Sequence, residues 1–394
     1  MKKKLILLTA IITAVVMIII TTCFYITPVG KVVYYKLLSL TDDVTLSKLA
    51  KAEYIIDREF MGEIDKNTLT DSALSGYVSA LGDPYTGYLS ANVYRNMTES
   101  MEGSYRGIGI ACTIKDKQIV IKEVTEQSPA KNAGLEVGDI ILSVNGKKYN
   151  GDTFSDALSA IKSTKEGKSV ILGIKRGEET LEKEIKISRI SRGYVEEKIL
   201  DGNIGYIRIK TFGTDIAEDF EKAIKSIHDK KAESLIIDLR SNPGGSLESV
   251  VVTTDLLLGE GIITTVKAKD GDKEEYKSDK NEVDLPMCVL INSESASASE
   301  IMAGALKHYK KATLVGEKTF GKGVVQAIYE FGDGSALKLT VAKYFTPSGE
   351  CIDGVGISPD IEVLMPDGMP VAEEKILTEE DVQLQRAKEI LMKK

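Results

Sequence analysis

The sequence has no tryptophan and only two histidines, His228 and His308, among its 394 residues. Histidine is the usual general base of a serine triad, so a Ser-His-Asp arrangement is hard to assemble from this composition. His228 lies in a charged, amphipathic helical pattern and His308 near the end of an expected helix. We interpret both as surface or cap residues, and a nucleophilic hydroxyl in this chain would therefore need a different base.

Cysteine is also scarce. The spacing of the four cysteines contains no C-x-x-C pair that would indicate a metal site and no even framework that would predict disulfides. Two of them lie in apolar, strand-like runs and are interpreted as small buried hydrophobes rather than redox or catalytic groups. We expect no metal ion and no cofactor. The four are Cys23, Cys112, Cys288 and Cys351.

Excess positive charge is absent as well. The chain has 51 Lys and Arg against 59 Asp and Glu, which gives a formal net charge of −8. No basic domain or arginine-rich strip occurs, and this argues against a nucleic-acid partner. The length predicts two or three domains with ample material for a core.

The start of the chain differs from the rest in composition. Three lysines at positions 2–4 precede residues 5–26, which carry no charged side chain. Such a run is long enough to span a bilayer and longer than the apolar part of a typical signal peptide. The lysines predict a cytoplasmic N-terminus. We therefore expect a single-pass cell-membrane protein with extracytoplasmic catalytic domains, or a secreted protein if the segment is cleaved.

A cluster of small residues, 295–300 (Ser-Ala-Ser-Ala-Ser-Glu), lies between two contrasting patterns. The apolar run 288–291 predicts a short buried strand, and Ile301, Met302 and Leu306 fall on one face of a helix. The cluster is thus expected at a strand-to-helix turn. The first backbone N–H groups of a helix have no partner within it and favour negative charge, so this turn has the geometry of an oxyanion hole.

A serine at this turn requires a base, because a hydroxyl is a weak nucleophile until its proton is taken. Lysine can serve when burial lowers its pKa enough to leave it neutral. Lys322 is flanked by Gly321 and Gly323 and followed by two valines, which is a suitable environment. From the residues alone, however, Ser295, Ser297 and Ser299 remain nearly equal candidates for the nucleophile.

Three motifs in this order resemble those of the carboxy-terminal processing peptidases, also called tail-specific proteases. They are the serine cluster, residues 316–323 (Gly-Glu-Lys-Thr-Phe-Gly-Lys-Gly) and residues 238–245 (Asp-Leu-Arg-Ser-Asn-Pro-Gly-Gly). The resemblance implies that Ser297 is the nucleophile and that Lys322, 25 residues later, is the base. It also implies that Gln326, four residues after the lysine, orients the lysine side chain.

The glycine turn at residues 242–245 follows an expected buried strand at 234–239, a position where open α/β sheets place ligands. The resemblance implies that the N–H of Gly244 or Gly245 forms the oxyanion hole with the N–H of Ala298. The alternative is that residues 242–245 form a loop turn that binds no ligand.

Glu300 and Thr319 match family positions that support the active site. Some relatives have an aspartate eleven residues after the nucleophile, where this chain has His308. The resemblance therefore does not extend to a third, acidic catalytic residue.

Residues 103–187 change to short alternating strands that resemble a PDZ domain. The glycine-containing stretch at 107–110 would supply backbone N–H groups for a terminal carboxylate, and the adjacent strand edge would accept an extended peptide. Arg106 either helps to hold that carboxylate or is a solvated strand-end residue. Residues 83–89 (Asp-Pro-Tyr-Thr-Gly-Tyr-Leu) resemble a segment that precedes the PDZ domain in the same family. The candidate peptide-binding residues are Gly107, Ile108, Gly109 and Ile110.

The predicted fold class is α/β: a mixed α/β, crotonase-like serine-protease core with an inserted PDZ-like, β-rich domain and an N-terminal helical region. The C-terminal tail is expected to be helical and to form a surface cover or a dimer contact. The expected parts are 1–30 (lysines and anchor or signal segment), 31–99 (helical region), 100–187 (PDZ-like domain), 188–365 (catalytic core) and 366–394 (tail).

The resulting hypothesis is a serine endopeptidase with a Ser-Lys dyad that cleaves extracytoplasmic proteins. Its expected partners are protein or peptide substrates with accessible C-terminal tails, the membrane through the N-terminal segment, a possible second copy, and no nucleic acid. One alternative is a membrane-tethered PDZ-type binding protein with an inactive or partner-dependent core. A crotonase-like acyl-transfer enzyme fits the PDZ-like domain poorly, and a chymotrypsin-like protease lacks a suitable histidine.

Overall fold

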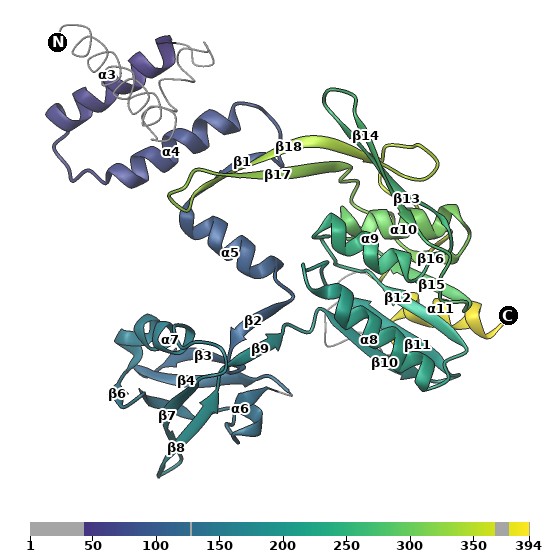
Figure 1. The fold of residues 1–394 in the computed structure, drawn as a ribbon, viewed down its shortest axis with the longest axis horizontal. Helices are drawn as coiled ribbons and strands as arrows, with labels where there is room; N and C mark the ends of the chain where they lie inside the picture. The colour runs from purple at the N-terminus through teal and green to yellow at the C-terminus, as the bar shows by residue number, and fades with distance from the viewer. Residues whose placement is uncertain (1–42, 127, 367–377, 394) are drawn as a thin grey trace, which may run out of the picture. The chain divides into compact units, whose positions relative to one another are not determined.

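The computed structural model describes residues 43–126, 128–366 and 378–393 (Figure 1). The chain divides into two compact units, Met1–Leu74 and Ser75–Lys394. The first unit contains α3 (Asp43–Glu59) and the first part of α4 (Lys66–Ser79). The Asp65 carboxylate accepts hydrogen bonds from the N–H groups of Asn67 and Thr68, and it therefore satisfies donors that the start of α4 leaves open.

The predicted single-pass membrane localisation is contradicted. Across the described ranges, no helix is both long enough and apolar enough to cross a membrane. The apolar segment at residues 5–26, on which that prediction and the predicted membrane partner depended, lies outside the described residues.

The expected catalytic core is built on a six-stranded sheet with the order β10-β11-β12-β15-β16-β19. β10 is antiparallel to β11, whereas the remaining neighbours are parallel. Every residue of β11, β12 and β15 is buried, as the continuous apolar runs predict for strands covered on both faces. The strands are β10 (Val195–Leu200), β11 (Ile204–Ile209), β12 (Ser234–Asp238), β15 (Met287–Ile291), β16 (Ala312–Gly316) and β19 (Ile361–Glu362).

Alternating side chains divide the core of this sheet into two layers. Ile237 and Val289 pack with helices α8 (Ile216–Asp229), α9 (Leu247–Asp255) and α10 (Ala298–His308). Ile236 and Cys288, their immediate neighbours in sequence, pack instead with α11 (Val382–Met392). Because successive strand residues point to opposite faces, α11 covers the face that the other three helices leave open (Figure 1). The described helix of the C-terminal tail thus covers this face of the sheet.

A second, five-stranded sheet carries the segment that follows the expected base. Its β17 (Val324–Glu330) and β18 (Ala336–Phe345) form a hairpin, and their register shifts between Val325 and Gln326. Such a bulge re-aims the side chains beside it. The other strands are β1 (Gly87–Leu89), β13 (Gly261–Ala268) and β14 (Lys273–Ser278), and the helix α5 (Ala91–Met101) follows β1.

The β-rich region has a core of its own, which contains Ile119, Ile141 and Leu172. Its sheet has the order β3-β4-β5-β7-β8, with β6 paired to β5, so that β3 is an edge strand. A separate pair, β2 and β9, connects the two ends of this region. The elements are β2 (Ser104–Gly107), β3 (Ile110–Lys115), β4 (Gln118–Val124), α6 (Pro129–Asn132), β5 (Ile140–Val144), β6 (Lys147–Lys148), η1 (Gly151–Thr153), α7 (Phe154–Lys162), β7 (Ser169–Arg176), β8 (Glu179–Lys186) and β9 (Ser188–Ser191).

Candidate active site

The serine cluster lies where it was expected, on the turn that leads from β15 into α10. Ser297 is the N-cap of α10 and has φ 56° and ψ −114°. Residues with a Cβ rarely adopt this conformation, and strained strand-to-helix turns of this kind expose a side chain above a sheet. The N–H of Ser297 donates to Oε2 of Glu300 at 2.8 Å, and this bond holds the turn in place.

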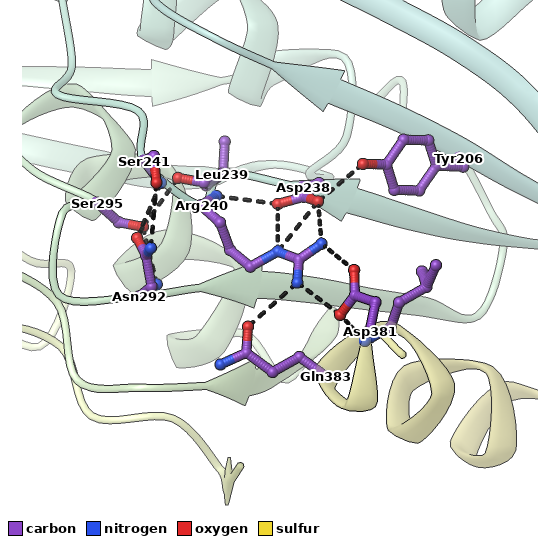
Figure 2. A network of polar contacts seen from close by, with 10 residues as sticks. Tyr206, Asp238, Leu239, Arg240, Ser241, Asn292, Ser295, Asp381 and Gln383 are labelled. Atoms are coloured by element: carbon purple, nitrogen blue, oxygen red, sulfur yellow. Dashed lines mark hydrogen bonds and ion pairs between the residues drawn. The ribbon is translucent and has the colours of Figure 1, made fainter. Parts of the chain in front are cut away.

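Two of the three serines use their hydroxyls within the fold. Ser295 is fully buried, and its Oγ donates to the Leu239 carbonyl oxygen at 2.8 Å (Figure 2). Ser299 is also buried, and its Oγ donates to the carbonyl oxygen of Asn242 at 2.9 Å. Ser297 is the partly exposed member of the set. The structure therefore separates three serines that the sequence leaves equivalent.

The glycine turn after β12 lies directly against Ser297. Gly244 and Gly245 have φ of 104° and 146°, values that favour glycine. A Cβ on Gly244 would lie 2.8 Å from the Cβ of Ser297 and 3.0 Å from the backbone nitrogen of Ala298. The sequence-predicted residues of the oxyanion hole are thus neighbours in space.

The three predicted N–H donors are not equivalent. The N–H of Gly244 donates to Oδ1 of Asn242 at 2.9 Å and is therefore occupied. No described residue accepts a hydrogen bond from the N–H of Gly245 or from that of Ala298. Among the described residues, the N–H of Ala298 at the helix start and the N–H of Gly245, which follows Gly244 in the glycine loop, are therefore both open.

Glu300 connects the serine turn to the loop of Lys322. This fully buried carboxylate accepts hydrogen bonds from the N–H groups of Ser297, Gly321 and Lys322 and from Oγ1 of Thr319, at 2.6 to 2.9 Å. Burial raises the pKa of Glu300, although these hydrogen bonds oppose that shift. Glu300 and Thr319 therefore fix the main chain on both sides of the site.

Lys322 is partly buried beside this carboxylate. Burial lowers the pKa of its amine, and the positive charge of Lys338 acts in the same direction, whereas Glu300 and Asp83 act against it. Its Nζ lies 5.1 Å from the ring centroid of Tyr85. Among the hydrogen bonds of the described residues, none joins this Nζ to the Ser297 hydroxyl. The main chains of Ser297 and Lys322 are thus held together through Glu300, but no hydrogen bond among the described residues joins their side chains.

Gln326 lies on β17 at the bulge and pairs in register with Thr340 of β18. Its Nε2 is buried and has no hydrogen-bond partner in the part of the chain that the structure describes. Buried amides are nearly always satisfied, so an open donor of this kind calls for an explanation in function.

Comparison with known proteins identifies the family. The pattern of peptidase family S41 matches residues 203–363, that of PDZ domains matches 107–187, and that of the activating protease CtpB N-terminal domain matches 35–93. The carboxy-terminal processing protease CtpA of Bacillus subtilis (strain 168) is 38% identical over 330 residues, which are 83% of this chain and 71% of that protein. The chain belongs to peptidase family S41.

Other relatives of this S41 peptidase include a probable CtpA-like serine protease of Staphylococcus aureus (strain MSSA476), 35% identical over 333 residues, 84% of this chain and 67% of that protein. Among solved structures, the photosystem II D1 C-terminal processing protease is 27% identical, with a TM-score of 0.48, over 82% of this chain and 88% of that chain. The predicted family, the mixed α/β fold with a PDZ domain, and the predicted enzyme class are confirmed.

Tyr85 of this S41 peptidase lies beside Lys322, a contact that the sequence did not predict. It belongs to the segment 83–89, for which the sequence offered only a resemblance. Asp83 accepts hydrogen bonds from the N–H of Tyr85 and from Oγ1 of Thr86, and Oγ1 of Thr86 in turn accepts from the N–H of Thr340. β1 then continues along β18. The segment is therefore fixed to the sheet whose strand β17 begins two residues after Lys322, and the electron-rich ring faces the amine.

Neither histidine lies near this site. The side chain of His228 is 88% exposed. His308 is exposed at the C-terminal end of α10 and packs edge-on against Tyr309. It is the eleventh residue after Ser297 along the helix, a rise of about 16 Å. Both interpretations as surface residues hold, and the S41 peptidase has no histidine at the position of a general base.

The glycine stretch of the PDZ domain has the open donors that carboxylate binding requires. The carbonyl oxygens of Ile108 and Gly109 accept hydrogen bonds from the N–H groups of Ala130 and Thr125. The N–H groups of Ile108 and Gly109 have no acceptor among the described residues. Ile108 buries its side chain in the domain core, so it would contribute its backbone alone.

The remaining candidates around this loop have structural partners. Gly107 pairs with Ser188, and Ile110 pairs with Val124 at the start of the edge strand β3. The guanidinium of Arg106 donates from Nη2 to the carbonyl oxygen of Lys162 at 3.1 Å. It therefore contacts the end of α7 rather than standing free as a carboxylate ligand.

Proposed function

We propose that this S41 protease cleaves polypeptides with Ser297 as the nucleophile and Lys322 as the general base, and that it recognises their C-terminal ends through its PDZ domain. The observation that carries the proposal is the turn at Ser297, a strained and partly exposed N-cap with two open N–H donors beside it. The neighbouring serines are excluded as nucleophiles because their hydroxyls donate to backbone carbonyls in the interior.

In the proposed mechanism, Oγ of Ser297 attacks the scissile carbonyl while the neutral amine of Lys322 takes the hydroxyl proton. The carbonyl oxygen becomes an oxyanion, which the N–H groups of Gly245 and Ala298 stabilise by about 3 kcal/mol each. The lysine then returns the proton to the leaving amine, and water releases the acyl group by the same steps. Gln326 holds the amine in line during both transfers.

In the proposed mechanism, the amine of Lys322 turns from the Tyr85 ring to the Ser297 hydroxyl. A cation over an aromatic face favours the charged form of the amine, whereas the base must be neutral. The four-carbon stem of lysine rotates freely enough to exchange one position for the other. Tyr85 and Lys338 therefore act in opposite senses on the protonation of the base, one through its ring and the other through its charge.

The first prediction concerns the pH dependence of cleavage. Replacing Lys338 by glutamine removes a positive charge that lowers the pKa of Lys322, so that pKa should rise towards its ordinary value. The acid limb of kcat/KM, which reports the base in the free enzyme, should move to higher pH. If the acid limb moves up by one pH unit, kcat/KM at pH values below the limb falls about tenfold.

The matched control is Lys267→Gln, which removes an exposed lysine from the same sheet. It should leave the acid limb where it is in the wild type. A limb that stays fixed in Lys338→Gln would count against Lys322 as the titrating base.

The second prediction tests tail recognition with substrates rather than protein variants. We expect the enzyme to cleave an unfolded protein with a free apolar C-terminus about 10 to 100 times more efficiently than the same protein with an amidated C-terminus. Amidation removes the charge-assisted hydrogen bonds to the N–H groups of Ile108 and Gly109, and such bonds contribute about 1.5 to 3 kcal/mol.

The measurement is kcat/KM for both substrates, with a short blocked peptide as the control that cannot reach the PDZ domain. Equal rates for acid and amide would contradict carboxylate recognition. Binding of the acid tail without cleavage of any substrate would instead support a tail-binding protein whose protease core is inactive or depends on a partner.

A further inference from the structure

A buried ionic network joins the end of β12 to α11, on the side of the sheet that α11 covers (Figure 2). Its centre is Arg240, which is fully buried two residues after β12 ends. Its Nη2 is 2.6 Å from Oδ2 of Asp238, and its Nη1 and Nη2 are each 2.8 Å from an oxygen of Asp381. Nη1 also contacts Oε1 of Gln383 at 3.2 Å. The guanidinium therefore forms a bidentate ion pair with each of two carboxylates.

Both carboxylates are at most 2% exposed, so the network is shielded from water on all sides. Removing one partner from a buried ionic group is strongly destabilising, because it leaves charge without compensation. The guanidinium lowers the pKa of Asp238 against the effect of burial, and the hydroxyl of Tyr206 donates to the same carboxylate at 2.8 Å. The arginine is thus held in one orientation by groups from β11, β12 and the C-terminal tail.

The main chain of Arg240 leads directly into the oxyanion loop. The next residue, Ser241, has φ 57°, and its N–H donates to Oδ1 of Asn292 at 2.8 Å. The carbonyl oxygen of Asn242 accepts from the N–H of Ala296 at 3.0 Å. The loop is therefore fixed at its start by the Arg240 network and along its length by the serine turn, with Gly245 at its far end.

The tail brings Asp381 to this network through its own helix. Asp381 is the N-cap of α11, and its Oδ1 accepts from the N–H of Leu384 at 3.0 Å. Leu384, Ala387 and Leu391 bury the same helix against the sheet. Gln383 adds a second connection, since its Nε2 donates to the carbonyl oxygen of Val363 at 2.8 Å.

We propose that Asp381 is a positioning residue for catalysis. Its carboxylate, presented by α11, holds Arg240 so that the loop 240–245 keeps the open N–H of Gly245 beside that of Ala298. The C-terminal helix thus completes the oxyanion hole from the opposite face of the sheet, without contact to substrate. This inference rests on the proposed function, because it assigns the Gly245 N–H to the oxyanion.

The test is Asp381→Asn in the full-length chain. Asparagine keeps the Oδ1 acceptor that caps α11, but it places an NH2 group against the Arg240 guanidinium and removes the charge. We expect kcat to fall about 10- to 100-fold with KM within about twofold of wild type, as for an interaction made only in the transition state. Affinity for a peptide aldehyde, which forms a tetrahedral adduct with the serine, should fall in parallel.

Leu391→Ala is the matched control, because it weakens the packing of α11 at its other end and leaves Asp381 unchanged. It should lower the thermal midpoint while kcat stays near the wild-type value. Gln383→Met is a second variant in case Asp381→Asn does not fold. It removes the 3.2 Å contact to Arg240 and should reduce kcat severalfold.

Wild-type kcat in folded Asp381→Asn and Gln383→Met would overturn the inference. So would an equal loss of kcat in Leu391→Ala, because the effect would then reflect the stability of the tail alone. Failure of the proposed function has a different signature: Ser297→Ala would continue to cleave. The two ideas can therefore fail separately.

Discussion

Replacing Ser297 by alanine, or Lys322 by methionine, is expected to lower the cleavage of an unfolded protein by about 10³- to 10⁶-fold. The alanine removes the attacking oxygen. The methionine keeps most of the buried stem of the lysine but cannot accept the hydroxyl proton. Because the two groups act as a unit, the double variant should be no slower than the slower single variant. The measurement is product formation over time at a pH where wild type is fully active.

The control for the lysine is Lys318→Met, an exposed residue of the same loop, and it should keep full activity. Thermal unfolding of each variant shows whether the fold is intact. Cleavage by Ser297→Ala at the wild-type rate would exclude Ser297 as the nucleophile. Loss in Ser297→Ala with full activity in Lys322→Met would retain the serine and require another base.

Much of the core architecture could be predicted, because strands that are buried on both faces are continuous apolar runs in the sequence. The apolar run 288–291 corresponds to β15, and the amphipathic helical pattern that contains His228 corresponds to α8, which ends at Asp229. The turn that joins β17 to β18 contains Gly332 and Gly334, which both have positive φ, and glycine is typical of such turns. These features depend on near neighbours in the chain, which a sequence displays directly.

The site was predicted less completely because its details depend on distant contacts. Ser295, Ser297 and Ser299 are chemically identical, and they differ only through the carbonyl oxygens that fold against them. Tyr85 reaches Lys322 from a part of the chain more than two hundred residues earlier. Asp381 lies 141 residues from Arg240 in sequence, and no local pattern predicts that pair.

The glycine turn shows both what the sequence could predict and what it could not. Its position after a buried strand indicated an oxyanion hole, but the sequence could not choose between Gly244 and Gly245. The choice depends on Asn242, whose side chain accepts the N–H of Gly244 and leaves that of Gly245 open. Gly244 is consequently proposed to act through its lack of a side chain rather than through its N–H.

This division of roles predicts a large effect for Gly244→Ala. The new Cβ would lie 2.8 Å from the Ala296 carbonyl oxygen, 2.8 Å from the Ser297 Cβ and 3.0 Å from the Ala298 nitrogen. These atoms belong to the rigid turn, so the loop must move away and take the Gly245 N–H with it. We expect kcat/KM to fall about 10²- to 10³-fold, the usual cost of losing one oxyanion donor.

Backbone strain at φ 104° contributes separately, about 1 to 3 kcal/mol of lost stability. Gly349→Ala isolates that contribution, because Gly349 has φ 84° and open space around its Cβ position. It should lose stability but keep kcat/KM, whereas Gly244→Ala should lose both while its PDZ domain still binds a free C-terminal tail. If the two variants lose equal activity at equal thermal midpoint, strain alone explains the effect, and the contact between Gly244 and the nucleophile turn has no catalytic consequence.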